Sequence, residues 1–236
     1  MIGSKKHASR VCYEGGLMRR LFILGIVGML SSSAFAADPA GIKIDKEKKA
    51  VIIDAKVAPR KLPQHDKVYP IEVVACWPDP KGKKAHETVV TIDANPSDVH
   101  KALVSLDLKP GKPARGENTE AVGPEVRVFL EIPDGGGTRK LSIHRFLIDP
   151  KTKQAFPREV KFRFTGSVMS KPDPTKPEMY GADVTGTLIA IYPVTDETVC
   201  QTSLTMKDEK FLKLDVDSTV MPKEGTAIKL IIEAVK

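Results

Sequence analysis

Short runs rich in hydrophobic residues, several of them alternating with polar residues, follow one another from residue 42 to the C-terminus. A hydrophobic residue at every second position is typical of a β-strand with one buried face. Turn-forming residues such as glycine, proline and aspartate bound many of the runs. We therefore predict strands over 42–44, 50–53, 71–76, 86–93, 126–132, 140–143, 160–164, 187–192, 211–216 and 227–232.

One segment has instead the spacing of an amphipathic helix. Its hydrophobic residues recur at intervals of three and four positions, at Val99, Ala102, Leu103 and Leu106. Asn95 is a favourable N-cap residue, and Pro96 suits the first helical position. Lys109-Pro110-Gly111 ends the pattern. We predict one well-capped helix over about 95–107.

The expected fold class is therefore α+β: a mostly antiparallel β-sheet, the one well-capped helix, and long loops rich in proline and glycine. The longest proline-rich loops fall at 59–70 and 172–177. Residues 37–236 are enough for a single domain with a substantial hydrophobic core.

A different pattern precedes the strands. Arg19 and Arg20 lead into ten residues, 21–30, without a charged side chain, and the small residues Ala34 and Ala36 follow. A positive end, an apolar core and an A-x-A ending are typical of a secretory signal peptide. A membrane anchor needs about 20 apolar residues, more than this run provides. We therefore predict cleavage after Ala36.

Residues 1–17 show no periodicity, so either Met18 is the true start or the leader has an unusually long N-terminal region. In both cases 1–36 is a leader, and the working chain is 37–236. We expect this chain to be exported, to the periplasm or the medium, with no membrane span left after cleavage.

Charge excludes one class of partner. The leader contains five basic residues and one acidic residue, so its removal reduces the formal net charge from +7 to +3. The remaining lysines are scattered through turns such as 81–84, whereas a nucleic-acid-binding protein carries a clustered basic face. We expect no nucleic-acid partner, and an envelope or extracellular partner whose identity the sequence does not give.

Two cysteines, Cys76 and Cys200, remain after cleavage. In an oxidising compartment they either form a disulfide that closes a long loop or stay apart as two buried thiols. An iron–sulfur cluster normally needs four thiolates at short spacings, which argues against one here. No cofactor is predicted, and a metal ion is left as the one open alternative.

Five short motifs stand out along the strands and the helix. They are KAHET at 84–88, PSDVHKAL at 96–103, KPG at 109–111, GS at 166–167 and PKEGT at 222–226. Together they resemble the YdjY-type domain of bacterial exported proteins, over most of 42–236. Thr88 stands where this resemblance leads us to expect serine. The resemblance implies no particular chemistry, because the function of the family is not established.

Cys76, His86 and Glu87 form the candidate metal or thiol site. If the turn over 77–85 joins two antiparallel strands, Cys76 and His86 lie near one another. Thiolate, imidazole and carboxylate groups suit zinc or copper. The alternative is ordinary hairpin packing, in which His86 is a polar partner for a backbone group.

The other candidates are weaker. Helix and strand spacings put His100 about 15–20 Å from His86, too far to share an ion. We expect His100 to hydrogen-bond a neighbouring loop, with a catalytic role as the alternative. His65 and His144 form no recognisable constellation, and Gly166-Ser167 lacks the G-x-S-x-G frame of many serine hydrolases.

The sequence thus favours an exported, non-enzymatic binding or structural module of the cell envelope. The alternative is a metal- or redox-active periplasmic protein that uses Cys76, His86 and Glu87, and a hydrolase comes third.

Overall fold

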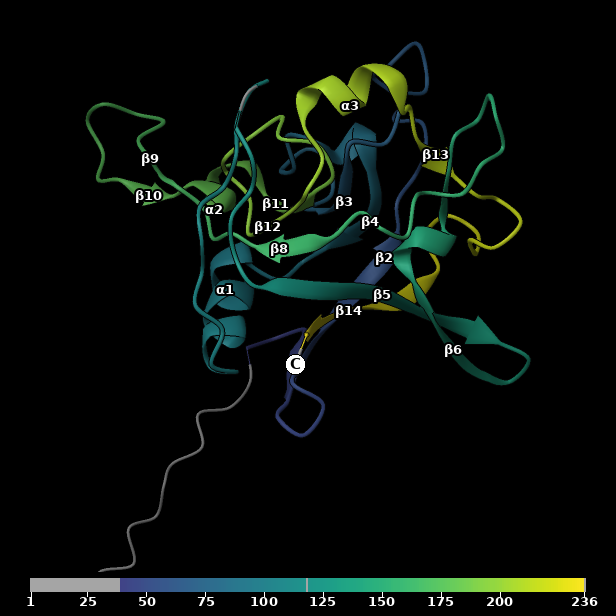
Figure 1. Cartoon of the computed structure of the whole chain (residues 1–236), viewed down its shortest axis with the longest axis horizontal. Coiled ribbons are helices and arrows are strands. Elements are labelled where there is room, and N and C mark those ends of the chain that lie inside the picture. The colour runs from purple at the N-terminus through teal and green to yellow at the C-terminus, as the bar shows by residue number, and fades with distance from the viewer. Residues whose placement is uncertain (1–38, 118, 236) are drawn as a thin grey trace, which may run out of the picture. The chain divides into compact units, whose positions relative to one another are not determined.

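Eight strands close into a β-barrel in this protein (Figure 1). The computed structural model describes residues 39–117 and 119–235. The predicted leader 1–36, the cleavage after Ala36 and the alternative start at Met18 lie outside the described residues. In that part of the chain, no helix is long and apolar enough to cross a membrane.

The strands are β1 (Ile42–Asp45), β2 (Ala50–Val57), β3 (Val73–Cys76), β4 (Thr88–Ile92), β5 (Glu125–Asp134), β6 (Gly137–Ser142), β7 (Leu147–Ile148), β8 (Phe162–Phe164), β9 (Met169–Ser170), β10 (Met179–Tyr180), β11 (Thr187–Ala190), β12 (Cys200–Thr202), β13 (Asp215–Val216) and β14 (Ala227–Ala234). The helices are α1 (Pro96–Val104), α2 (Gly181–Thr185) and α3 (Met206–Phe211), with single 3₁₀ turns η1 (Ala85–Glu87) and η2 (Ile143–Arg145).

The barrel runs β2-β14-β5-β8-β12-β11-β3-β4 and closes where β4 pairs with β2, with Ala55 opposite Ile92. Closure leaves the barrel without a free edge. The long strands β2 and β5 each have two partners on one edge. Along β2 these are β1 and then β4, and along β5 they are β6 and then β8. The β5–β6 hairpin therefore extends away from the barrel (Figure 1).

The predicted fold class, a mostly antiparallel sheet with one well-capped helix over about 95–107, is wrong. The sheet is a closed barrel, two of its strand pairs (β3–β4 and β11–β12) are parallel, and the described residues form three short α-helices. Closure depends on pairing between distant segments, such as β2 with β14, and alternation within a strand carries no information about its partner.

The helix caps also differ from prediction. The Asn95 side chain makes no capping bond to the backbone, and its amide group donates instead to Asp98 Oδ2 at 3.1 Å. A complete capping box is found at α3, where Thr205 accepts from the backbone and Asp208 accepts from the Thr205 N–H at 2.7 Å. The strand predicted over 211–216 is the end of α3 followed by β13.

Packed side chains fill the barrel. Alternate residues of β2, β5 and β14 are buried in one hydrophobic cluster, among them Ile53, Leu130 and Leu230, each with no exposed surface. Their neighbours along each strand, such as Lys56 and Lys229, are exposed on the outer wall. An eight-stranded barrel is narrow enough for side chains to fill it completely. The concavities described below lie on the outside of the barrel.

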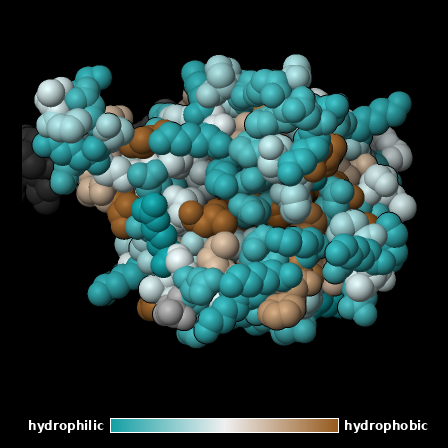
Figure 2. Space-filling model, turned by 90° about the horizontal axis from the view of Figure 1, so that it is seen from above, coloured by the Kyte–Doolittle hydropathy of each residue, from teal (hydrophilic) through white to brown (hydrophobic). Residues whose placement is uncertain are grey.

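The face seen from above, on the side of α3, is largely hydrophilic with small separate hydrophobic patches (Figure 2). Phe211 of α3 is the most exposed large hydrophobic side chain among the described residues, at 86%. Single exposed hydrophobic residues of this kind are common on soluble surfaces and do not define an interface.

Candidate functional site

The structure separates Cys76 from His86. Strands β3 and β4 are parallel, with Val73 opposite Thr88 and Cys76 opposite Thr91. Cys76 therefore lies at the opposite end of the pair from the residues that precede Thr88, about 10 Å further along strands that rise ~3.3 Å per residue, and its thiol packs against the loop at Gly82 and Lys84. The antiparallel hairpin expected across 77–85 is wrong, because this segment crosses back to start β4 in the same direction as β3.

His86 and Glu87 do lie together, in a compact group of charged side chains. His86 Nε2 is 3.2 Å from Glu87 Oε1, and Lys84 Nζ lies 2.7 Å from Glu87 Oε2 and 3.2 Å from Glu72 Oε2. Burial and the Glu87 charge raise the pKa of Glu72, and burial lowers the pKa of His86. Lys84 thus joins two carboxylates, and Glu87 has both oxygens engaged.

The imidazole of His86 also packs in an aromatic group. Its ring centroid lies 4.6 Å from that of His65 and 5.0 Å from that of Tyr69, and Lys67 Nζ lies 5.0 Å from the Tyr69 centroid. Within residues 39–117 and 119–235, no three His, Cys, Asp or Glu side chains are gathered so that they could hold a metal ion. The metal site predicted at Cys76, His86 and Glu87 is not assembled in this arrangement.

The two cysteines are separate, buried thiols. Cys76 on β3 and Cys200 on β12 have β11 between them. Two strand spacings amount to roughly 9.5 Å, beyond the ~7 Å limit for the Cα atoms of a disulfide. Burial raises the pKa of both thiols, which disfavours the reactive thiolate. Of the two interpretations of these cysteines, the structure contains the unpaired one.

His100 makes the hydrogen bond to a neighbouring segment that the sequence predicted. Its Nδ1 lies 2.7 Å from the Tyr180 hydroxyl, which accepts from the Ser167 N–H at 3.1 Å. Gly166 packs against the same imidazole with φ +67°, and a Cβ there would lie 3.0 Å from Pro110 Cβ and 3.3 Å from His100 Cε1. Three of the motifs noted in the sequence therefore meet at this contact between α1 and the β8–β9 segment.

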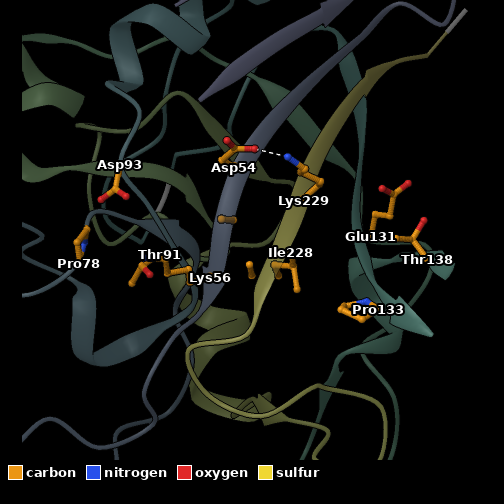
Figure 3. Close-up of a pocket in the computed structure, with 12 residues that line it drawn as sticks. Asp54, Lys56, Pro78, Thr91, Asp93, Glu131, Pro133, Thr138, Ile228 and Lys229 are labelled. Atoms are coloured by element: carbon orange, nitrogen blue, oxygen red, sulfur yellow. Dashed lines mark hydrogen bonds and ion pairs between the residues drawn. The ribbon is translucent and has the colours of Figure 1, made fainter. Parts of the chain in front are cut away.

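A groove of about 500 Å³ crosses the outer wall of the barrel over β4, β2, β14 and β5 (Figure 3). Asp93 and Pro78 lie at one end, and Pro133 and Thr138 lie at the other. Lys56 and Lys229 project from the strands between them. Sequence reasoning missed this groove because its residues come from separate strands that only barrel closure brings side by side.

The charges of this groove alternate across neighbouring strands. Asp54 of β2 lies opposite Lys229 of β14, which lies opposite Glu131 of β5, which lies opposite Lys140 of β6. Asp54 and Lys229 form an ion pair, drawn as a dashed line in Figure 3. Opposite charges at cross-strand positions stabilise a sheet. The groove is therefore close to electrically balanced and offers little to attract a charged ligand.

A second concavity, of about 450 Å³, lies where β5 changes partner from β6 to β8, and we call it the fork pocket. Its lining residues come from β5, the end of β6, the η2 turn, and the segment that leads into β8. They are Glu125, Val126, Arg127, Phe129, Ser142, His144, Arg145, Arg158, Val160, Lys161 and Phe162. Four of these side chains are cationic and one is anionic, so the fork pocket carries an excess of positive charge.

His144 lies at the branch of the fork pocket. Its Nε2 lies 3.0 Å from the Val160 carbonyl oxygen, and its Nδ1 lies 2.9 Å from Ser142 Oγ. The imidazole stacks on Phe156 with centroids 5.1 Å apart. Burial lowers the pKa of His144, which favours the neutral ring. His144 therefore connects the end of β6 to the residues just before β8.

A family model, that of the YdjY domain, matches residues 42–233, which is most of the chain. The resemblance noted in the sequence motifs is confirmed by this match. No curated protein and no solved structure matches the chain.

Proposed function

This chain belongs to the YdjY domain family, and we propose that it is an exported, non-enzymatic module of the cell envelope that binds a ligand on the outer wall of its barrel. The observation that supports this proposal is the fork pocket, a concavity with excess positive charge, whereas the groove across β4, β2, β14 and β5 is close to balanced.

The filled interior supports an outer binding surface. Inward-facing side chains such as Ile53, Leu130 and Phe164 have no exposed surface and belong to a single cluster. Opening this interior to a ligand would remove packed contacts, each large side chain contributing about 2–5 kcal/mol. Rigid outer walls on long strands, in contrast, hold surface side chains in fixed positions without any cost to the core.

The leader supports export. The positive end and apolar core of a leader direct a chain across the membrane, and the A-x-A ending allows the leader to be cleaved off. The test is the intact mass of the protein recovered from the envelope fraction of the cells. We expect a mass that begins at Ala37, and a chain that retains 1–36 would contradict export by this route.

Binding is tested by following backbone amide chemical shifts while the protein beginning at Ala37 is titrated with three probes: citrate (anionic), putrescine (cationic) and maltose (neutral). We expect shifts for at least one probe, confined to outward-facing residues of the barrel strands and η2. If no probe shifts any resonance, or if the shifts fall only on interior residues such as Leu230, the proposal is wrong.

A further inference from the structure

The fork pocket exists because of a local irregularity in the sheet. Phe129 of β5 lies opposite Ser142 of β6, whereas Val126 lies opposite Phe162 of β8. The two β5 residues between them have no strand neighbour on this edge, and η2 occupies the space. Such branch points open a hollow in an otherwise continuous wall.

The positive charge at this hollow is only partly compensated. Lys161 lies 3.3 Å from Glu125, and Arg127 lies 3.8 Å from Glu233, a carboxylate that Lys140 also contacts. Arg145 and Arg158 form no ion pair with any side chain in the described part of the protein. Two exposed guanidinium groups therefore line the fork pocket with their donors available.

The base of the fork pocket is apolar. Val126, Val160 and Phe162 are buried lining residues, and the half-buried Phe129 ring lies beside them. Ser142 is already hydrogen-bonded to His144, and His144 to the Val160 carbonyl, so both ring nitrogens of His144 are occupied and few polar groups here remain for a ligand. A basic rim over an apolar base matches a molecule that is anionic at one end and apolar at the other.

Guanidinium groups bind carboxylate and phosphate with two parallel hydrogen bonds, which favours these anions over others. We infer that the fork pocket binds a ligand with a phosphate or carboxylate group on an apolar body, and that Arg145 and Arg158 hold the anionic group. This inference rests on the proposed binding function and assigns it a site and a ligand class. The same chemistry is found in a free amphiphilic anion and in an anionic lipid headgroup.

The experiment compares two double variants of the same charge. R145Q/R158Q removes two arginines from the fork pocket, and R115Q/R139Q removes two exposed arginines that lie outside it, in ion pairs with Asp196 and Asp134. The dissociation constants of phenyl phosphate and inorganic phosphate are measured by calorimetry for the wild type and both variants. Both variants lose the same positive charge, so a loss of binding in only one of them indicates a specific site and not long-range electrostatic attraction.

We expect phenyl phosphate to bind the wild type more tightly than inorganic phosphate, because its ring contacts the apolar base. R145Q/R158Q should weaken phenyl phosphate binding about tenfold or more, and R115Q/R139Q should leave it nearly unchanged. If both variants weaken binding equally, or if the wild type binds neither phosphate, the inference is overturned. The proposed function would still stand if citrate, putrescine or maltose shifted resonances elsewhere on the outer wall.

Vesicles distinguish the two sources of the ligand. Sedimentation with phosphatidylglycerol vesicles but not phosphatidylcholine vesicles, lost in R145Q/R158Q and kept in R115Q/R139Q, would support the inference with a lipid headgroup as ligand. Binding of phenyl phosphate at the fork pocket without sedimentation would support it with a freely diffusing ligand.

Discussion

His144 donates a hydrogen bond from Nε2 to the carbonyl oxygen of Val160, at 3.0 Å. A carbonyl oxygen only accepts, so this contact fixes the proton of the neutral ring on Nε2 and leaves Nδ1 to accept from the Ser142 hydroxyl. The bond spans the gap between β6 and β8, at the place where the wall of the barrel branches. His144 therefore links the two sides of the branch that forms the fork pocket.

His144→Ala should lower the free energy of unfolding by about 2 kcal/mol, because it leaves the Val160 carbonyl without this donor and removes the stacking on Phe156. Urea unfolding at neutral pH measures the change. His144→Gln keeps an amide donor at the same position and should lose less. Equal stability of the Ala variant and the wild type would show that the branch is held by other contacts.

Acid should destabilise the protein through its partly buried histidines. Burial lowers the pKa of His86, His100 and His144 below the ordinary value of 6.5, so the unfolded chain takes up protons before the folded chain does. The stability from the neutral rings is complete above pH 6.5 and is lost as the pH falls below it. Glu72, whose pKa is raised from 4.5, acts with the opposite sign. As the pH falls, the folded chain takes up this proton before the unfolded chain does, so Glu72 adds stability and does not produce the loss.

Urea unfolding at pH values from about 7.5 down to about 5.5 measures the loss, a range in which histidines titrate. His144→Gln should reduce the slope, because it removes one of the three groups. A stability that is constant over this range, or a slope that His144→Gln leaves unchanged, would contradict the assignment.

Gly166→Ala should destabilise the contact between α1 and the β8–β9 segment. The residue has φ +67°, and an added Cβ would press on Pro110 and on the His100 ring. Strain of this kind costs about 1–3 kcal/mol. Gly136→Ala is the matched control, since Gly136 has φ +90° in a turn with nothing within 4 Å of an added Cβ. Thermal unfolding should show a larger decrease for Gly166→Ala, and equal decreases would mean that the crowding is relieved elsewhere.

The two N-caps should respond differently to alanine. Thr205→Ala removes the capping box of α3 and should cost about 1 kcal/mol. Asn95→Ala removes a side chain that makes no capping bond and should cost less. Denaturant unfolding of both variants provides the comparison. A larger loss for Asn95→Ala would show that its bond to Asp98 matters more for α1 than the cap geometry suggests.

Several strands could be predicted from the sequence because the signal is local. The segments 50–53, 126–132 and 227–232 are rich in hydrophobic and β-branched residues, and they lie within β2, β5 and β14. The strand predicted over 211–216 was wrong at its start, because Phe211 is the last residue of α3 and its side chain is exposed to solvent instead of packed in the core. The exposure of a side chain depends on the surrounding structure, so a segment of six residues does not reveal it.

In the candidate site, too, local contacts could be predicted from the sequence and long-range ones could not. His86 and Glu87 are adjacent in sequence and remain in contact, whereas Cys76 was joined to them only by an assumed strand direction. A parallel connection and an antiparallel hairpin have the same hydrophobic pattern, so the residues cannot distinguish them. The sequence did not indicate Arg145 and Arg158 as binding residues, because each is a single basic residue in its own segment.

By itself, the amino-acid sequence determined the family and the β-rich character, because these follow from side-chain type at successive positions. Only the tertiary structure decided that β2 pairs with both β14 and β4, that β3 and β4 are parallel, and that two arginines thirteen positions apart line the fork pocket. Those relationships are contacts between distant segments. They are selected by the joint packing of the whole barrel, and the sequence of one segment does not specify its distant partners.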